Sequence, residues 1–337
     1  MRKKVGSKLV DNNEYILEIK GLKKYYKVPN STTKAYLKAV DGIDLKVRTG
    51  ETLGIVGESG CGKSTLGNLI VKLIEPTQGE IISSGINLND LKPKQLRNKR
   101  REMQIIFQDP YSSLNPRMRI FDIIAEPLVT HKLARGSALK ERVIELMEVV
   151  GLDADYLTRY PHEFSGGQRQ RIGIARALAL NPKVIVCDEP VSALDVSIQA
   201  QILNLLIKLQ KQFDLTLIFI AHGIQAVNYI SDQIAVMYLG RIVEIAGKEQ
   251  IMNHPKHPYT ELLLSSVPIS HPKYRNEKVK TVINRESPSP VNLPSGCRFH
   301  TRCPYADEKC KKEDPNLVET NDGHFVACHY PIIKENR

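Results

Sequence analysis

Short apolar runs separated by polar turns alternate with helical patterns along most of the chain. Clustered or alternating apolar residues predict strands over 15–19, 40–47, 52–56, 103–107, 184–187 and 215–220. Helical periodicity predicts helices, among them 65–74, 139–150 and 168–180. Strands that alternate with helices after a first strand, glycine-rich turn and helix are typical of a mostly parallel sheet with helices on its faces. We therefore expect an α/β fold, with the mostly helical stretch at about 112–178 inserted as a subdomain.

The glycine-rich turn follows the strand expected over 52–56. It matches the phosphate-binding pattern G-x-x-x-x-G-K-[ST] and comprises Gly57, Glu58, Ser59, Gly60, Cys61, Gly62, Lys63, Ser64 and Thr65. Backbone N–H groups and the helix N-terminus at such a turn suit phosphate oxygens. We expect Lys63 to reach the β- and γ-phosphates and Ser64 to offer its hydroxyl to Mg²⁺. Cys61 needs no chemical role, because only its backbone faces the phosphate.

Two further motifs point to nucleotide chemistry. The apolar run from Val184 to Cys187 ends in Asp188 and Glu189. Asp188 is suited to hold Mg²⁺ and Glu189 to polarise an attacking water. Upstream, Phe164 precedes a Ser-Gly-Gly-Gln run whose glycines let backbone N–H groups converge on an anion, and the run comprises Ser165, Gly166, Gly167 and Gln168.

The order of these motifs resembles that of ATP-binding-cassette ATPases. The shared set is 57–65, Gln108, 164–168, 188–189, 192–195 and His222. Two positions depart from the family pattern, because Phe164 replaces the usual Leu and Gly223 follows His222 where Asp is common. The resemblance implies a P-loop NTPase cassette over 14–252, with a RecA-like sheet core, an antiparallel β subdomain and the inserted helical subdomain.

Further roles come from this resemblance alone. Gln108 would contact Mg²⁺ and sense a transmembrane partner, and His222 would hold the γ-phosphate. Asp195 would lie in the loop that links two nucleotide sites. Tyr26, with Tyr25 as the alternative, would stack on adenine. Because Lys63 already holds this chain's own ATP, the Ser-Gly-Gly-Gln run is expected to bind the nucleotide of a partner subunit.

The part of the chain after the cassette resembles the C-terminal extension of oligopeptide and dipeptide permease ATPases. The resemblance lies in HPKHPYT from His254 to Thr260 and in ELLLSSVP up to Pro268, and residues 36–42 resemble the F-type subunit. It implies an extension over 253–337 and an ATPase that powers peptide import. Its expected partners are two transmembrane permease subunits, a paralogous D-type ATPase rather than a second copy of this chain, and indirectly an extracytoplasmic peptide-binding protein. The expected location is the cytoplasmic face of the cell membrane, as a peripheral protein.

Four of the six cysteines lie in the tail and are spaced C-x₅-C-x₆-C-x₁₇-C, at Cys297, Cys303, Cys310 and Cys328. Four thiolates can ligate zinc or an iron–sulfur cluster, although this spacing lacks the C-x₂-C pairs of common zinc sites. The family resemblance favours a structural [4Fe–4S] cluster, with zinc as the alternative. The neighbouring His300, His324 and His329 are not expected to be ligands.

Composition narrows the remaining alternatives. A net charge of +11 favours anionic partners, but no aromatic-rich basic stripe stands out, so nucleic acid is not expected. No apolar run reaches the ~18 residues of a membrane helix, and none follows the basic Met1 to Lys4 as in a secretory signal. Three alternatives to peptide import remain: a cytosolic cassette ATPase that meets no permease, a redox-sensing regulator, and an importer of nickel or another small solute. The first often carries tandem cassettes or a long coiled-coil insertion, and neither is seen.

Overall fold

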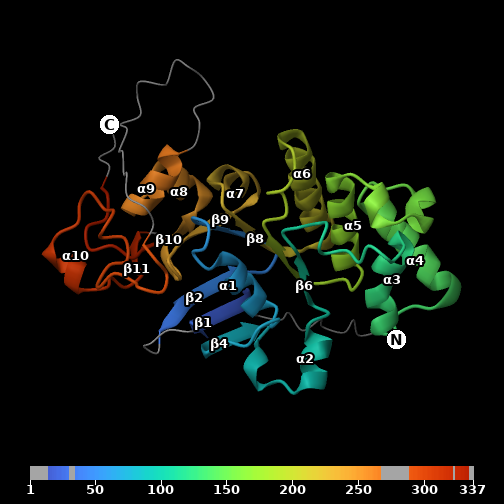
Figure 1. Cartoon of the computed structure of the whole chain (residues 1–337), viewed down its shortest axis with the longest axis horizontal. Coiled ribbons are helices and arrows are strands. Elements are labelled where there is room, and N and C mark those ends of the chain that lie inside the picture. The colour runs from blue at the N-terminus through green and yellow to red at the C-terminus, as the bar shows by residue number, and fades with distance from the viewer. Residues whose placement is uncertain (1–13, 30–34, 267–287, 322, 334–337) are drawn as a thin grey trace, which may run out of the picture.

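The computed structural model describes residues 14–29, 35–266, 288–321 and 323–333. Met1 to Lys4, and Val267 and Pro268 of the tail motif, therefore lie outside the described residues. Within these ranges the chain forms two sheets with helices around and between them. The two ends of the long axis of the molecule are formed by different parts of the chain (Figure 1).

The smaller sheet is antiparallel and comes from the first part of the chain. Its strand order is β2-β1-β4-β5, with bounds Tyr36–Arg48, Tyr15–Lys27, Gln78–Ser83 and Ile86–Asn87. Side chains of β2 alternate between exposed and buried positions along much of the strand, so one face of this sheet packs inward. This sheet corresponds to the antiparallel β subdomain expected from the sequence.

The larger sheet is mixed and carries the central strands. Its order is β11-β12-β10-β9-β3-β8-β7-β6. The bounds are Val318–Asn321, His324–Val326, Arg241–Gly247, Gln233–Tyr238, Thr52–Val56, Thr216–Ala221, Val184–Asp188 and Met103–Ile106. The strands from β9 to β6 pair in parallel, and β3, β7 and β8 are buried at every position. Because both faces of these strands are covered, their sequences are continuous apolar runs.

The first helix, α1 (Lys63–Ile70), packs between the two sheets. Its Leu66 and Leu69 belong to the same buried cluster as residues of β1 and β2 and as Val186 and Ile218 of the large sheet. The helix begins two residues before the expected Thr65 and ends at Ile70 instead of Ile74. It ends early because Lys72 adopts a positive φ of 55°, which a helix cannot continue through.

The helical subdomain lies at one end of the molecule (Figure 1). It contains α3 (Ile120–Thr130), α4 (Gly136–Val149) and α5 (Gly166–Leu178), and two 3₁₀ turns, Ala154–Thr158 and Pro161–Glu163, connect α4 to α5. Three more helices flank the sheets: α2 (Pro93–Lys99), α6 (Val196–Phe213) and α7 (Ile224–Ile230), and a further 3₁₀ turn spans Leu88–Asp90.

The C-terminal segment packs at the opposite end of the molecule (Figure 1). It includes α8 (Lys248–Asn253), α9 (Pro258–Ser265) and α10 (Glu308–Lys312). Its hairpin β11–β12 joins the large sheet, because β12 pairs with β10 through Glu244↔Val326 and Ile245↔Phe325. Glu244 is fully buried there and accepts hydrogen bonds from the backbone N–H groups of Lys256 and His257 and pairs with the His324 ring. These bonds compensate the burial of the carboxylate.

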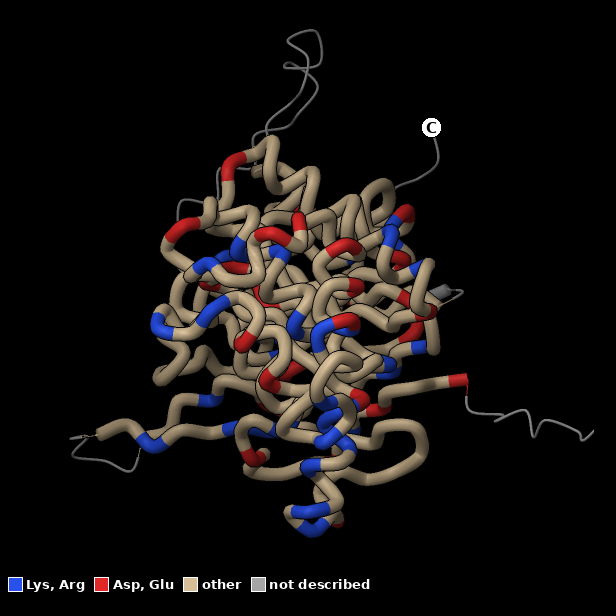
Figure 2. The backbone as a smooth tube through the Cα atoms, turned by 90° about the vertical axis from the view of Figure 1, so that its right-hand side faces the viewer, with Lys and Arg blue, Asp and Glu red and all other residues tan. Residues whose placement is uncertain are grey.

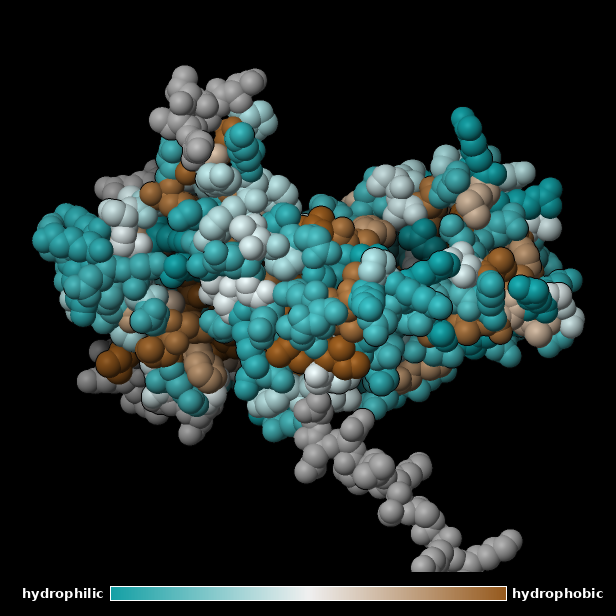
Figure 3. All heavy atoms as spheres, turned by 90° about the horizontal axis from the view of Figure 1, so that it is seen from below, coloured by the Kyte–Doolittle hydropathy of each residue, from teal (hydrophilic) through white to brown (hydrophobic). Residues whose placement is uncertain are grey.

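The surface is predominantly polar. Seen from the end that carries the helical subdomain, Lys and Arg are concentrated in the lower part, and acidic positions are interspersed above (Figure 2). Seen from below, apolar residues occur in separate patches among hydrophilic ones (Figure 3). No helix in the described ranges is both long and apolar enough to cross a bilayer.

Candidate functional site

The phosphate loop is shaped by two glycines that allow close backbone contact. A Cβ on Gly57 would lie 2.1 Å from the carbonyl oxygen of Met237, at the end of β9. A Cβ on Gly62 would lie 2.0 Å from the carbonyl oxygen of Ala39, and Gly62 also has a φ of 106°. Both positions therefore require glycine. The loop therefore packs closely against the end of β9 and the start of β2 in the absence of a ligand.

Lys63 is the first residue of α1, and its side chain folds back over the loop. Its side chain is almost fully buried, and Nζ donates to the carbonyl oxygens of Gly57 at 2.9 Å and Glu58 at 3.0 Å. The same Nζ lies 3.9 Å from Oε1 of Glu189. Its ammonium group is thus held at the centre of the loop. Cys61 packs beside it as an un-ionised thiol, since burial raises its pKa to about 11.

The two carboxylates at the end of β7 face the loop. Oδ1 of Asp188 accepts a hydrogen bond from the Ser64 hydroxyl at 2.9 Å, and burial raises the pKa of Asp188. Oε2 of Glu189 accepts from the Gln108 amide at 2.9 Å. These oxygen donors are the kind that Mg²⁺ binds, and a divalent cation would offset the burial of the Asp188 charge. The residues present therefore fit a magnesium ion.

Glu189 has an unusual backbone. It adopts a φ of 46°, and its N–H donates to the carbonyl oxygen of Ile220 at 2.9 Å. A left-handed conformation costs a residue with a side chain about 1–2 kcal/mol, and such strain concentrates at functional sites. His222, which follows β8, places Nδ1 3.7 Å from Oε2 of Glu189 and keeps most of its side chain exposed. We call Lys63, Ser64, Gln108, Asp188, Glu189 and His222 the carboxylate cluster.

The Ser-Gly-Gly-Gln run lies on the helical subdomain, at the N-terminus of α5. Ser165 and Gln168 form a capping box: the Ser165 hydroxyl accepts from the Gln168 N–H at 3.3 Å, and the Gln168 side chain accepts from the Ser165 N–H at 3.0 Å. A Cβ on Gly167 would lie 2.5 Å from Cγ2 of Ile198, in α6. Gly167 therefore has a packing role that the sequence did not reveal. Asp195 is the N-cap residue of that same helix, α6.

The two candidate adenine-stacking tyrosines are neighbours on β1 but differ in surroundings. Tyr26 is partly exposed, and the Lys24 ammonium lies 5.1 Å from its ring centroid. The Tyr25 hydroxyl donates to Asp41, which is also paired with Arg298 of the tail. The Tyr25 hydroxyl is therefore already hydrogen-bonded inside the protein, whereas the Tyr26 ring remains accessible.

The four tail cysteines line one small cavity together, although they are distant in sequence. Burial raises the pKa of Cys297 to about 11 and that of Cys328 to about 12. As placed, no three His, Cys, Asp or Glu side chains in the described ranges stand around one point closely enough to hold a metal ion. The nearby histidines have other partners: His300 contacts the Cys297 carbonyl, His324 contacts Glu244, and His329 contacts the Glu313 carbonyl.

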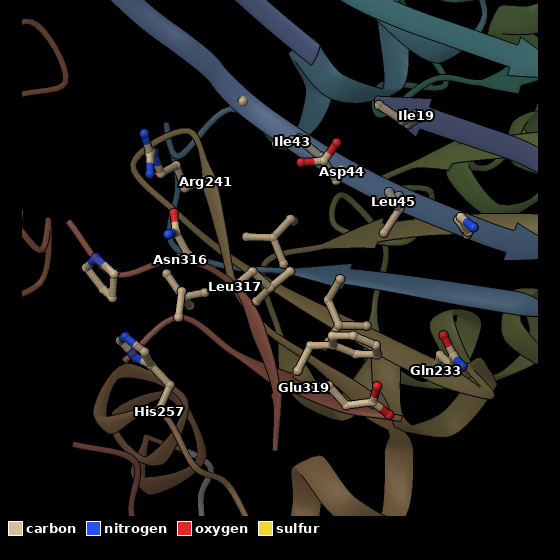
Figure 4. Close-up of a pocket in the computed structure, with 18 of the residues that line it drawn as sticks. Ile19, Ile43, Asp44, Leu45, Gln233, Arg241, His257, Asn316, Leu317 and Glu319 are labelled. Atoms are coloured by element: carbon tan, nitrogen blue, oxygen red, sulfur yellow. The ribbon is translucent and has the colours of Figure 1, made fainter. Parts of the chain in front are cut away.

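A separate cavity of about 860 Å³ lies between the antiparallel sheet and the C-terminal segment (Figure 4). Ile19, Ile43 and Leu45 face it from β1 and β2, and Leu317 and Glu319 face it from the C-terminal segment. None of the carboxylate-cluster residues lines it. The chemistry indicated by the sequence is therefore located elsewhere, at the ends of the central strands.

Sequence reasoning missed the residues that join the tail to the phosphate loop. Arg302 forms two hydrogen bonds with Glu58, both of 2.9 Å, and the Tyr259 hydroxyl accepts the Glu58 N–H at 2.8 Å. Neither residue belongs to a nucleotide motif. For Arg302 the available signal was a charged residue next to Cys303, and Tyr259 lies in the HPKHPYT motif, which indicated the family but not this contact.

Comparison with known proteins places the chain in a family. The model described as ABC transporter matches residues 40–192, and the model described as oligopeptide/dipeptide transporter, C-terminal region, matches residues 243–310. The oligopeptide transport ATP-binding protein AppF of Bacillus subtilis (strain 168) is 50% identical over 322 residues, which make up 94% of this chain and 98% of that protein. The oligopeptide transport ATP-binding protein OppF of Escherichia coli (strain K12) is 49% identical over 327 residues, 95% of this chain and 97% of that protein.

A solved structure supports the fold assignment. The ATP-binding cassette MJ0796, in a dimeric post-hydrolysis state bound to ADP and Pi, is 30% identical with a TM-score of 0.62, and the match covers 69% of this chain and 98% of that one. The chain therefore belongs to the ABC transporter family, among its oligopeptide and dipeptide transport ATP-binding proteins.

Proposed function

We propose that this protein is the ATP-hydrolysing subunit of a peptide importer and works on the cytoplasmic face of the cell membrane. The observation that carries the proposal is the carboxylate cluster: a phosphate-loop lysine, two strand-end carboxylates, a glutamine and a histidine meet at one end of the parallel strands. The names of its relatives, oligopeptide and dipeptide transport ATP-binding proteins, supply the substrate class.

Each residue of the carboxylate cluster has a separate role in ATP hydrolysis. Lys63 binds the β- and γ-phosphates. Glu189 orients a water and accepts its proton as the water oxygen bonds to the γ-phosphorus and the bond to ADP breaks. His222 holds the γ-phosphate. Ser64, Asp188 and Gln108 would hold Mg²⁺, which would supply positive charge to neutralise the phosphate oxygens.

The second half of the nucleotide site comes from another subunit. Ser165, Gly167 and Gln168 lie at the start of α5 in the helical subdomain. Helix α5 is drawn apart from α1, which begins in the phosphate loop (Figure 1). The glycine-opened N-terminus of α5 suits the γ-phosphate of a nucleotide held by the opposing cassette. Tyr26 stacks on adenine, and Asp195 lies near the contact between the two sites. The partner cassette is a paralogous D-type subunit, and two permeases and an extracytoplasmic peptide-binding protein complete the importer.

The tail cysteines form the site of a structural iron–sulfur cluster, with zinc as the alternative. The support is their convergence on one cavity and the chemistry of four thiols. Anaerobic purification should give a brown protein that contains iron and sulfide. Cys303→Ser should lose this colour, whereas Cys187→Ala, which removes a thiol outside the tail, should keep it. A colourless protein with stoichiometric zinc supports the alternative, and one with neither metal overturns the proposal.

Purification of the membrane complex tests the function. After gentle extraction the chain should co-purify with two permeases and a second cassette, and peptide should stimulate ATP hydrolysis. Stimulation by nickel or another small solute, and not by peptide, would reassign the cargo. A chain that remains alone after extraction and hydrolyses ATP without any permease would contradict the transport proposal and favour a cassette ATPase of another class.

A further inference from the structure

The C-terminal segment contacts the phosphate loop at Glu58. The Arg302 guanidinium binds the Glu58 carboxylate in a bidentate arrangement, with Nη1 to Oε2 and Nη2 to Oε1 both at 2.9 Å. The Arg302 side chain is 8% exposed and the Glu58 side chain 30%, so the protein shields this pair partly from solvent. A bidentate pair of this kind fixes both the position and the orientation of the two side chains.

The backbone of Glu58 is held by the same segment. Its N–H donates to the Tyr259 hydroxyl at 2.8 Å. Tyr259 is fully buried and packs on the rings of Tyr238 and Phe299, with centroid distances of 4.6 and 5.5 Å. Because this hydroxyl cannot move without disturbing an aromatic core, it is a rigid acceptor for the loop.

The carbonyl of the same residue accepts from Lys63. Its Nζ lies 3.0 Å from the Glu58 carbonyl oxygen. Glu58 therefore meets the tail through its side chain and its N–H, and meets the phosphate-binding lysine through its carbonyl. A shift of Glu58 would be transmitted directly to the residue that must bind the β- and γ-phosphates.

We infer that Arg302 and Tyr259 are positioning residues, through which the C-terminal segment holds the phosphate loop in its ATP-binding conformation and neutralises the Glu58 charge. This inference rests on the proposed ATP site. It makes nucleotide affinity in the cassette, matched over 40–192, depend on residues that belong to the separately matched region over 243–310.

The negative charge of Glu58 sets the expected order of effects. Without Arg302, the Glu58 carboxylate would lose its bidentate partner beside the loop that receives a polyphosphate, and like charges repel. Arg302→Ala should therefore raise the Kd for MgATP about tenfold, the size expected for a charge-assisted hydrogen-bonded pair. Glu58→Gln should have a smaller effect, because it removes the charge while it keeps a polar group of the same shape.

The decisive test is a double-mutant cycle on equilibrium binding of MgATP. Arg302→Ala combined with Glu58→Gln should bind ATP as Glu58→Gln does alone, so that removal of the carboxylate rescues the arginine variant. Arg302→Lys should be intermediate, because lysine keeps the charge but not the fork. Tyr259→Phe should raise the Kd about fivefold, since it removes the hydroxyl that accepts the Glu58 N–H. The kcat at saturating ATP should change little in the Arg302 and Tyr259 variants.

Arg241→Ala is the matched control. Arg241 pairs with Asp314 at the same docking interface, in an ion pair that does not involve the phosphate loop. It should lower stability without changing the Kd. Equal Kd shifts in Arg241→Ala and Arg302→Ala would show a general docking effect and overturn the inference, as would wild-type affinity in Arg302→Ala and Tyr259→Phe. A wild-type protein that binds no ATP would overturn the proposed function itself.

Discussion

Glu189 is held from several directions before any substrate binds. Gln108 donates to its carboxylate at 2.9 Å, the Lys63 ammonium lies 3.9 Å away, and His222 lies 3.7 Å away. Its backbone has a φ of 46°, which would relax if the surroundings did not fix it. The position of this carboxylate is therefore determined by the fold and not by the ligand, as preorganisation of a general base requires.

Replacement of Glu189 by Gln should stop turnover. The amide keeps the shape and the bond to Gln108 but cannot take the proton of the attacking water, so kcat should fall by about 10²–10⁴-fold. ATP binding should persist. Phosphate release measures turnover, and the amount of nucleotide retained by the protein measures binding. Glu102→Gln is the control, because Glu102 pairs with Lys99 and Lys183 outside the carboxylate cluster. Undiminished hydrolysis in Glu189→Gln would remove Glu189 from the role of base.

At this scale the sequence predicts residues that belong to spaced motifs, and it does not predict their long-range partners. The phosphate loop, Asp188 and Glu189 could be named because their chemistry needs a fixed local order. The Arg302–Glu58 pair could not, since its members are 244 residues apart in sequence and meet only through the docking of the tail. The second role of Gly167, contact with Ile198, was hidden for the same reason.

Elements with continuous apolar runs were the easiest to predict. The strand expected over 52–56 is β3, Thr52–Val56, and the one expected over 184–187 is β7 with a single further residue. Hairpin β11–β12 was not predicted, because Val318–Asn321 contains only one strongly apolar residue. Its stability comes from pairing with β10, a contact that local pattern does not reveal.

The close approach of α5 and α6 gives a test at the level of helices. In Gly167→Ala the new Cβ would meet Ile198 at 2.5 Å, and such overpacking should cost about 1–3 kcal/mol of unfolding free energy. Gly173→Ala lies in the same helix with nothing within 4 Å of its Cβ, and should stabilise by about 0.5–1 kcal/mol through helix propensity. Denaturant unfolding measures both. A tolerated Gly167→Ala would contradict this packing.

The start of α9 should make the docked tail sensitive to acid. Burial lowers the pKa of His257 to about 4, and its Nδ1 accepts the Tyr259 N–H as the helix cap. The unfolded chain binds this proton near the ordinary pKa of about 6.5, so between these values the unfolded state holds more protons and stability falls as pH falls. At pH 5 the loss relative to pH 7 is about 2 kcal/mol.

His257→Asn should keep the cap and remove the titration, because asparagine is a good N-cap residue. The melting temperature should therefore fall less steeply between pH 7 and pH 5 in this variant than in the wild-type protein. His254→Asn, three residues upstream and at the end of α8, is the control and should follow the wild-type profile. An equal dependence of melting temperature on pH in the wild-type protein and His257→Asn would contradict the assignment of the acid sensitivity to His257.

On the scale of the whole molecule, the nucleotide site lies between two structures with different proposed roles. The helical subdomain carries the Ser-Gly-Gly-Gln run at one end, and the C-terminal segment contacts the phosphate loop from the other (Figure 1). The order of motifs was enough to predict the cassette. The docking of the tail was not predictable, because it depends on buried contacts such as Arg298–Asp41 and Glu244–His324 that join distant residues.

The most direct test of peptide import is uptake by the reconstituted complex. Vesicles that contain this chain, its partner cassette and two permeases, with the peptide-binding protein outside and MgATP inside, should accumulate labelled peptide. The Glu189→Gln complex should assemble and bind ATP but accumulate none. Equal accumulation by the wild-type and Glu189→Gln complexes, or wild-type hydrolysis that proceeds without peptide uptake, would contradict the proposal that ATP hydrolysis at this site drives peptide import.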